Sequence, residues 1–400
     1  MPGFEIFGDE ERKEVMEVLN TGVLFRYEFT EQRQGIYKVR EFEDTFARYC
    51  GSKYAQAVTS GSTALKVALT ALGVGPGDEV ITQGFTFVAT WEAILEVGAT
   101  PVFCEVDTTL NMDPHDLESK ITPKTRCIIP VHMLGAPARI REIVAIAQRH
   151  AIPVLEDSAQ AAGARIDGRH LGSFGSCGTF SFDSVKTMTT GEGGMIITDD
   201  QNLWQTMSEY HDHGHDHREN PGGRGGEGRR FIGFNYRMME IQGAIGLAQL
   251  AKLDSIVERQ QGNKAQLKQA ASAIPGVQFR TLIDEKGDSA TFFAFMLQDK
   301  KHCQRVLDSL RNAGFPPIYF AENTWHYFPK WEHLLEGKTP IRSGYPFMEP
   351  GGKRRIQYDQ DALPESSAII ERTLVYPVSI NMDTERLEAM AAALKKAAEV

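Results

Sequence analysis

The sequence contains no apolar run that approaches the roughly 20 residues needed to cross a bilayer as a helix. Its opening stretch, MPGFEIFGDEERKEVMEVL, is acidic and amphipathic and does not resemble a signal peptide. These two absences argue against a membrane-spanning or exported protein. We therefore expect a soluble, cytoplasmic protein that has no membrane partner.

Cysteine is also scarce, and no CxxC spacing occurs. An odd number of isolated thiols argues against a disulfide framework and favours buried, reduced cysteines. The five cysteines are Cys50, Cys104, Cys127, Cys177 and Cys303.

Positive charge is in deficit, because 43 lysines and arginines stand against 53 acidic residues, for a net charge of −10. A surface of this sign repels nucleic acid and anionic membranes, and no segment resembles a DNA-binding module. We expect no nucleic-acid partner. Small charged substrates stay possible, because a pocket can carry a local field opposite to that of the whole molecule.

The composition is that of a globular protein, with 42% hydrophobic and 24% charged residues, and 400 residues suit two domains. In the first half, short apolar runs alternate with amphipathic stretches of helical spacing, which predicts a mostly parallel sheet covered on both faces. The strand-like runs lie at 54–60, 78–84, 100–107, 125–134 and 152–160.

The second half begins with a helical pattern of about 35 residues, at 237–272, which is longer than an average helix. Beyond it, strand-like stretches such as TFFAFML mix with helix-like ones such as KHCQRVLDSLRNAG. We therefore predict a large α/β domain over residues 1–250 and a small α+β domain over residues 251–400.

Three polar features follow strand-like runs, at the sheet edge where ligands of α/β proteins gather. Residues 60–63 (SGST) bring hydroxyls and backbone N–H groups to a helix N-terminus, which suits an anion or is an ordinary helix cap. Asp157 follows the apolar run IPVL, so it is either a partly buried carboxylate paired with a cation or a second cap. Lys186 precedes the turn TTGEGG and is either solvated or a desolvated amine able to form an imine.

Taken together, the three features meet the needs of one cofactor, pyridoxal 5′-phosphate. Its phosphate needs an anion cradle, its ring nitrogen a carboxylate, and its aldehyde a lysine. Lys186, once displaced by an incoming amine, is free to move a proton. The glycines after Lys186 allow the chain to turn tightly.

Six segments, in order and spacing, resemble the DegT/DnrJ/EryC1/StrS family of sugar aminotransferases. They are TSGSTAL, GATPVFCEVD, VHMLGAP, LEDSAQAAGA, SFDSVKTMTTGEGG and GFNYRMMEIQGAIGLAQL. The resemblance spans nearly the whole chain. It implies the aspartate-aminotransferase fold (fold type I), with a mostly parallel seven-stranded sheet and a smaller α+β C-terminal domain. It also implies a homodimer whose active sites are shared between subunits.

The resemblance assigns roles position by position. It makes Lys186 the catalytic lysine and Asp157 the partner of the pyridine nitrogen, while Gln160 lies near the phenolic oxygen. Phe87 stacks on the ring face, and Asn235 reaches the phosphate from the neighbouring subunit. The expected phosphate contacts are Gly61, Ser62, Thr63 and Ser181. Relatives with histidine at the lysine position are dehydratases, so lysine favours transamination.

The substrate is less well defined by the sequence. Arg26 and Tyr27 lie in LFRYEF, a segment that borders the active site in this family, and Arg26 suits either a carboxylate or an interface ion pair. His326 and Tyr327, in NTWHYFPKW, are candidates to contact a sugar, although Trp325 beside them suits a domain core. The run YHDHGHDH invites a metal site (His211, His213, His215 and His217), but the chemistry needs no metal. We instead expect His213 and His215 to contact sugar hydroxyls.

Several segments, among them PGFEIFGDEE, LFRY and DHGHDH, most resemble one branch of the family. That branch installs the amine of 8-amino-3,8-dideoxy-manno-octulosonate, using glutamate as the amino donor and a free keto sugar acid as the acceptor. The alternatives are a nucleotide-linked 3-keto or 4-keto sugar aminotransferase, a pyridoxal-phosphate-dependent dehydratase, and a non-catalytic regulatory relative. The intact Lys186, Asp157 and Gln160 argue against the last.

Overall fold

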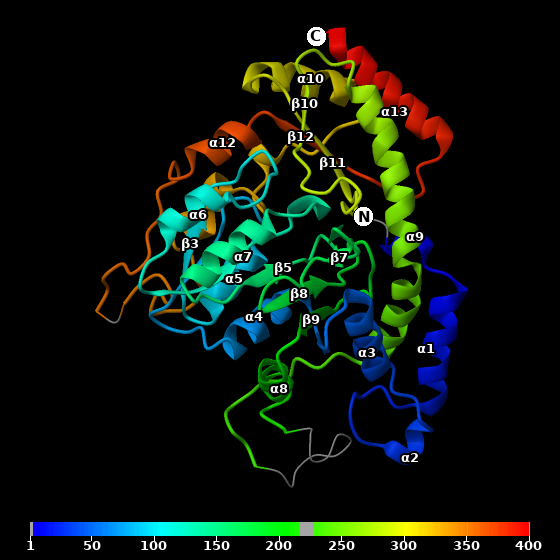
Figure 1. Cartoon of the computed structure of the whole chain (residues 1–400), viewed down its shortest axis with the longest axis vertical. Helices are drawn as coiled ribbons and strands as arrows, with labels where there is room; N and C mark the ends of the chain where they lie inside the picture. The colour runs from blue at the N-terminus through cyan, green and yellow to red at the C-terminus, as the bar shows by residue number, and fades with distance from the viewer. Residues whose placement is uncertain (1–2, 217–227, 350, 400) are drawn as a thin grey trace.

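The computed structural model describes residues 3–216, 228–349 and 351–399. In this part of the chain an α/β domain and a smaller α+β domain are connected by one long helix, α9 (Glu240–Ala271), which runs up the right side of Figure 1. None of the described helices combines the length and apolarity needed to cross a bilayer.

The central sheet of the large domain has the strand order β3-β2-β4-β5-β8-β9-β1, in which two hydrogen-bonded groups are joined by bridges between the β4 and β5 regions. β9 runs antiparallel to both of its neighbours, and the other pairings are parallel. This confirms the predicted mostly parallel seven-stranded sheet. The strands are β1 (Tyr54–Val58), β2 (Glu79–Gln83), β3 (Thr100–Cys104), β4 (Thr125–Ile129), β5 (Leu155–Asp157), β8 (Cys177–Ser181) and β9 (Gly194–Thr198).

Helices cover both faces of this sheet because alternate strand residues point to opposite sides. Val80 packs in the cluster that includes α4 and α5, whereas its neighbour Ile81 packs with α6 and α7. A third cluster joins α3 and α9 to the β1-β9-β8 side. The helices are α3 (Lys38–Cys50), α4 (Gly61–Ala71), α5 (Ala89–Glu96), α6 (Pro114–Lys120), α7 (Ile140–Arg149) and α8 (Gln201–Tyr210).

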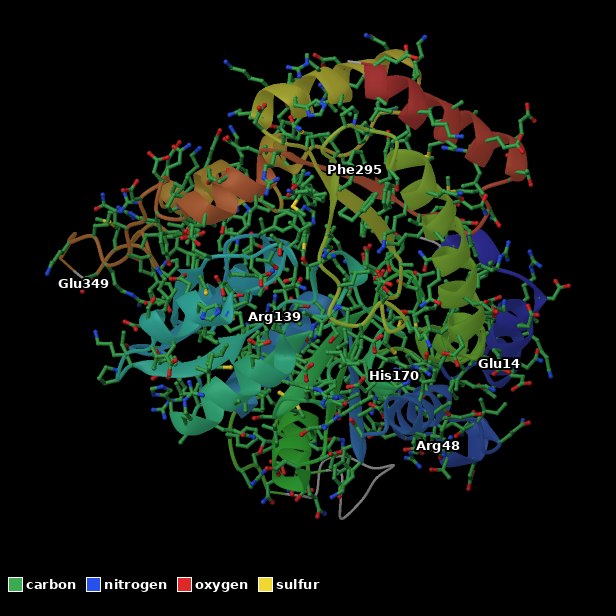
Figure 2. All side chains as sticks on the ribbon, turned by 45° about the horizontal axis from the view of Figure 1, so that its top comes forward. Glu14, Arg48, Arg139, His170, Phe295 and Glu349 are labelled. Carbon is green, nitrogen blue, oxygen red and sulfur yellow. The ribbon has the colours of Figure 1, made fainter. Side chains whose placement is uncertain are left out.

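The small domain is built on an antiparallel sheet of order β10-β11-β12. Phe295 of β11 is fully buried in a cluster shared with α9, α10 and α13, and its position is labelled in Figure 2. The predicted boundary at residue 250 falls inside α9, so this helix belongs to both domains. The elements are β10 (Gln278–Phe279), β11 (Phe292–Met296), α10 (Lys300–Asn312), β12 (Thr373–Pro377) and α13 (Thr384–Lys396).

The remaining elements are short or peripheral. α1 (Asp9–Thr21) lies beside α9 and contacts it, as Figure 1 shows. The others are η1 (Gly3–Ile6), α2 (Thr30–Arg33), η2 (Met133–Gly135), β6 (Arg165–Ile166), β7 (Arg169–His170), η3 (Phe320–Glu322), η4 (Phe328–Lys330), α11 (Glu332–Leu335), α12 (Pro364–Ile370) and η5 (Ala397–Glu399).

Candidate active site

A cavity of about 420 Å³ lies where the carboxyl ends of β1, β5 and β8 meet the small domain. It gathers most of the side chains that the sequence predicts for the cofactor, although these are spread over more than 120 positions of the chain. The predicted residues that line it are Gly61, Ser62, Phe87, Asp157, Gln160, Ser181, Lys186 and His326.

One end of the cavity is the N-terminus of α4. Ser60 caps this helix: its hydroxyl accepts from the N–H of Thr63, and its own N–H donates to Thr63 Oγ1, at 3.1 and 2.8 Å. Thr63 is thus engaged in the cap, while Ser62 is exposed to the cavity. A Cβ on Gly61 would lie 2.7 Å from the Cβ of Ser181, so only glycine lets α4 approach β8 this closely. The result is a helix N-terminus that favours an anion.

Asp157, the last residue of β5, supplies a buried carboxylate and is 4% exposed. Its Oδ2 accepts a hydrogen bond of 2.9 Å from the hydroxyl of Thr90, and its Oδ1 accepts one of 3.1 Å from the N–H of Ala159. Burial raises the pKa of Asp157, and these hydrogen bonds and the charge of Lys186 only partly oppose the shift. A cationic group bound next to Asp157 would stabilise its ionised form.

Lys186 lies in the loop that follows β8. Burial lowers the pKa of Lys186, while the charges of Asp157 and Asp183 oppose this change. Its Nζ lies 5.9 Å from the centroid of the Phe87 ring. Lys186 and Asp157 both line the cavity. The lowered pKa of Lys186 favours a neutral, nucleophilic amine.

Gln160 has a fixed orientation in the cavity wall. Its Oε1 accepts a hydrogen bond of 2.8 Å from the N–H of Leu134, and its side chain is 5% exposed. Since the oxygen is occupied, the NH₂ group is the donor that Gln160 offers to a ligand.

The small domain forms a wall opposite Phe87. The ring centroids of Trp325 and His326 lie 5.6 and 5.3 Å from that of Phe87. His326 Nδ1 lies 3.0 Å from Asn323 Oδ1. Burial and the charge of Lys186 lower the pKa of His326 to about 4, so this imidazole is neutral at physiological pH.

Tyr327 lies elsewhere than the sequence led us to expect. It is 3% exposed and belongs to the core between the two domains, where its backbone bridges to Phe85. Because chain neighbours in an extended segment point to opposite sides, His326 reaches the cavity and Tyr327 does not.

A second group of predicted residues lies outside this cavity. Arg26 and Tyr27 border another cavity of about 480 Å³, next to α3 and α8, where Arg48 also lies (Figure 2). Arg26 Nη2 contacts both carboxylate oxygens of Glu43 at 2.6 Å, so this guanidinium is engaged in a buried ion pair. Tyr27 Oη lies 3.2 Å from His211 Nε2.

The histidine-rich run continues this second region. His215 Nε2 lies 3.2 Å from Arg229 Nη2, and His213 adopts a left-handed backbone conformation with a φ of 53°. Asn235 bridges to Asp212 through its backbone. In a single chain, the cavity of Lys186 is lined neither by His213, His215 and Asn235 nor by Arg26 and Tyr27. His217 falls outside the described residues.

Some residues that line the cavity of Lys186 were not predicted from the sequence. Thr90 lies three positions after Phe87 in FTFVAT, and this helical spacing was the available signal that both face one cavity. Phe292, Ile318 and Asn323 come from the small domain, and no local pattern marks them as site residues.

The residues of the cavity fit pyridoxal phosphate. A glycine-dependent helix N-terminus suits the phosphate, and a buried carboxylate whose charge is only partly compensated suits a protonated ring nitrogen. A desolvated amine suits an aldehyde, and Phe87 offers an aromatic face to a flat ring.

Comparisons with known proteins agree with this fit. The family described as the DegT/DnrJ/EryC1/StrS aminotransferase family matches residues 6–342. A GDP-perosamine synthase of Caulobacter vibrioides is 46% identical over 219 residues, which cover 54% of this chain and 56% of that protein. The spore coat polysaccharide biosynthesis protein SpsC of Bacillus subtilis is 32% identical over 395 residues, covering 98% of this chain and 95% of SpsC.

The fold is likewise found among solved structures. An aminotransferase from Psychrobacter cryohalolentis superposes with a TM-score of 0.81 at 28% identity, covering 98% of this chain and 96% of that one.

Proposed function

The chain belongs to the DegT/DnrJ/EryC1/StrS aminotransferase family, and we propose that it transfers an amino group from an amino acid, L-glutamate in the first instance, to a keto sugar. The observation that carries the proposal is that Lys186, Asp157 and the N-terminus of α4 border one cavity. Pyridoxal phosphate, when bound, supplies a ring that withdraws electrons from the carbon that bears the amine.

The residues of the chain would divide the work as follows. Gly61, Ser62 and Ser181 would hold the phosphate at the start of α4, and Asp157 would keep the ring nitrogen protonated. Lys186 would bind the aldehyde and, once free, carry a proton between the substrate carbon and the cofactor. Its lowered pKa suits this task, because a neutral amine can accept the proton. The remaining expected cofactor contacts are Thr63, Phe87 and Gln160 of the same chain and Asn235 of a second copy.

The sugar would bind beside the aromatic contact that Phe87 makes with Trp325 and His326 of the small domain. Trp325 is 59% exposed and offers an aromatic face, and neutral His326 can exchange hydrogen bonds with a hydroxyl group. Two substrate classes compete for this space. The resemblance to the 8-amino-3,8-dideoxy-manno-octulosonate branch favours a free keto sugar acid, namely the 8-oxo compound.

One of the named relatives favours the second class, since the name GDP-perosamine synthase refers to a nucleotide-linked sugar. The ion pair of Arg26 with Glu43 also weakens the case for Arg26 as the group that binds a free sugar acid. A panel of 8-oxo-octulosonate and nucleotide-linked 3-keto and 4-keto sugars, each with glutamate, decides between the classes by the amine formed. Loss of water without amine formation would instead indicate a dehydratase, and no reaction at all would favour a regulatory relative.

We further propose a homodimer with shared active sites. Apolar side chains around Asn235 are exposed in the single chain: Ile232 is 83%, Phe234 47% and Met239 50% exposed. Leu24, 40% exposed, adjoins them, because its carbonyl accepts from the N–H of Glu240. A second copy covering this strip would bring its Asn235 toward the phosphate.

Mixing two inactive variants, Lys186→Ala and Asn235→Ala, tests this arrangement. If the sites are shared, mixed dimers contain one intact site and activity returns. If each chain builds its site alone, the mixture stays inactive.

A further inference from the structure

We propose that the N-terminal segment Gly3–Glu11 positions Lys186, by bracing the loop that carries it at two points and tying that loop to the small domain. The proposal rests on the role proposed for Lys186 as the residue that binds the cofactor.

The first brace is a direct backbone contact. The N–H of Gly3 donates a hydrogen bond of 3.0 Å to the carbonyl oxygen of Lys186. Gly3 is buried, and a Cβ on it would lie 2.8 Å from that oxygen and 2.9 Å from the backbone nitrogen of Thr189. Both obstacles are backbone atoms, so a side chain at position 3 must displace the lysine loop or the segment itself.

The second brace passes through Glu11 and Gln249. Glu11 is fully buried, and its Oε1 accepts a hydrogen bond of 2.7 Å from Gln249 Nε2. This contact turns the amide oxygen of Gln249 toward the lysine loop, where it accepts from the N–H of Thr189 at 3.3 Å. Lys252 Nζ lies 2.8 Å from both oxygens of Glu11 and balances its charge.

The ionisation of Glu11 supports this geometry. Burial opposes its charge, but hydrogen bonds from Lys252, Gly8 and Gln249 lower the pKa of Glu11. A carboxylate can only accept hydrogen bonds, so the ionised form fixes which end of the Gln249 amide faces Thr189.

A further set of contacts, made by Glu5, ties the segment to the small domain. Glu5 Oε2 accepts hydrogen bonds of 2.6 Å from Ser379 Oγ, 3.1 Å from the N–H of Ile380 and 3.0 Å from the N–H of Asn381. These residues follow β12. Figure 1 marks the N-terminal end beside α9, and Glu14, labelled in Figure 2, shows α1 continuing along that helix.

The lysine loop also has hydrogen bonds of its own, among them one of 3.0 Å from the N–H of Lys186 to the carbonyl of Asp183 and one of 2.9 Å from the N–H of Thr190 to the carbonyl of Phe182. Val185, next to the lysine, is nevertheless 51% exposed. The bracing residues Gly3, Glu11 and Gln249 are not among those that line the cavity. A displacement of about 1 Å at a reacting group can cost on the order of 100-fold in rate. Small shifts of the segment should therefore move the amine of Lys186 and slow its reaction.

The test measures attachment of the cofactor to Lys186 directly, without turnover. Purified protein is incubated with pyridoxal phosphate between pH 6 and pH 10, reduced with borohydride, and digested, and the labelled Lys186 peptide is quantified by mass spectrometry. The variants are Gly3→Ala, which adds a Cβ against the loop, and the isosteric Glu11→Gln. The matched controls are Gly262→Ala, where a Cβ meets nothing within 4 Å, and Glu258→Gln, which changes an exposed carboxyl group of α9.

We expect both variants to need about tenfold more pyridoxal phosphate for half-labelling and to move the pH midpoint of labelling, while both controls match the unsubstituted protein. Circular dichroism establishes that each variant is folded at the assay temperature. If Gly3→Ala does not fold, Gln249→Met replaces it, because that change removes both the acceptor of the Thr189 N–H and the donor to Glu11, and with them the second brace.

Folded variants that label Lys186 with the affinity and pH midpoint of the unsubstituted protein would overturn the proposal. An unsubstituted protein that takes up label elsewhere than Lys186 would instead refute the role of Lys186, and the inference with it.

Discussion

The hydroxyl of Thr90 donates a hydrogen bond of 2.9 Å to Asp157 Oδ2, and the same hydroxyl lies 2.8 Å from Thr86 Oγ1. The carboxylate beneath the proposed cofactor site is therefore held by a residue of α5, a different element from its own strand. A hydrogen bond to a charged group contributes about 1.5–3 kcal/mol, so this contact, together with that from the N–H of Ala159, favours the ionised form of Asp157 against the effect of burial.

Replacing Thr90 by valine keeps the shape and removes this donor. Burial already raises the pKa of Asp157, and loss of the hydrogen bond raises it further. The ionised carboxylate is then lost at a higher pH as the solution is acidified. We expect the acid limb of the kcat/KM profile to move to higher pH and kcat/KM at neutral pH to fall about tenfold. Superimposable pH profiles of Thr90→Val and the unsubstituted enzyme would contradict this role.

Gly61→Ala tests the phosphate cradle. Its Cβ would lie 2.7 Å from that of Ser181, so α4 must move away from β8. We expect the Kd for pyridoxal phosphate to rise at least about tenfold, equivalent to about 1.4 kcal/mol, as measured by equilibrium dialysis. Gly75→Ala, where a Cβ meets open space, is the control and should bind the cofactor normally. Equal affinities for both variants would mean that the start of α4 does not hold the phosphate.

His326→Phe separates sugar binding from reaction with the amino donor. Phenylalanine keeps the ring against Phe87 and Phe320 but cannot form hydrogen bonds with a hydroxyl group. We expect KM for the keto sugar to rise about tenfold, while the half-reaction with glutamate changes little. Since the pKa of His326 is about 4, its titration should leave no inflection between pH 6 and pH 8. An unchanged KM for the sugar would remove His326 from the substrate site.

Glu156→Gln concerns stability. This fully buried carboxylate accepts from the N–H groups of Gly172, Phe174 and Gly175, at 2.9, 2.6 and 2.7 Å, and lies 3.0 Å from His132 Nε2. An amide oxygen replaces only part of this set, and the amide NH₂ then faces donors. We expect the free energy of unfolding to fall by about 3 kcal/mol in urea denaturation. A decrease in the free energy of unfolding of less than about 1 kcal/mol would show that the loop of residues 172–175 does not depend on the negative charge of Glu156.

The sheet of the large domain was predictable from the sequence, and so was the gathering of polar residues at one of its edges, because both follow from local patterns. Apolar runs mark β1 and β5, and polar residues directly after parallel strands must meet at one sheet edge, which brings Asp157 near Ser62. The small-domain wall could not be predicted this way. Asn323 and Phe292 reach the cavity only through packing of one domain on the other, and no pattern around them indicates it.

Two further differences have physical causes. The predicted domain boundary at residue 250 rests on a change of pattern, but α9 is one continuous helix from Glu240 to Ala271 and packs on both sheets. Tyr327 and His326 are neighbours in the sequence and are both predicted to contact the sugar. An extended backbone directs Tyr327 into the core and His326 into the cavity.

Transfer of nitrogen in solution tests the central claim most directly. The protein, loaded with pyridoxal phosphate, is incubated with ¹⁵N-labelled glutamate and each keto sugar of the panel, and the products are analysed by mass spectrometry. The account predicts ¹⁵N in an amino sugar, with one 2-oxoglutarate formed per label transferred, and no transfer by Lys186→Ala. Label that stays in glutamate with every sugar, or that is still transferred by Lys186→Ala, would contradict it.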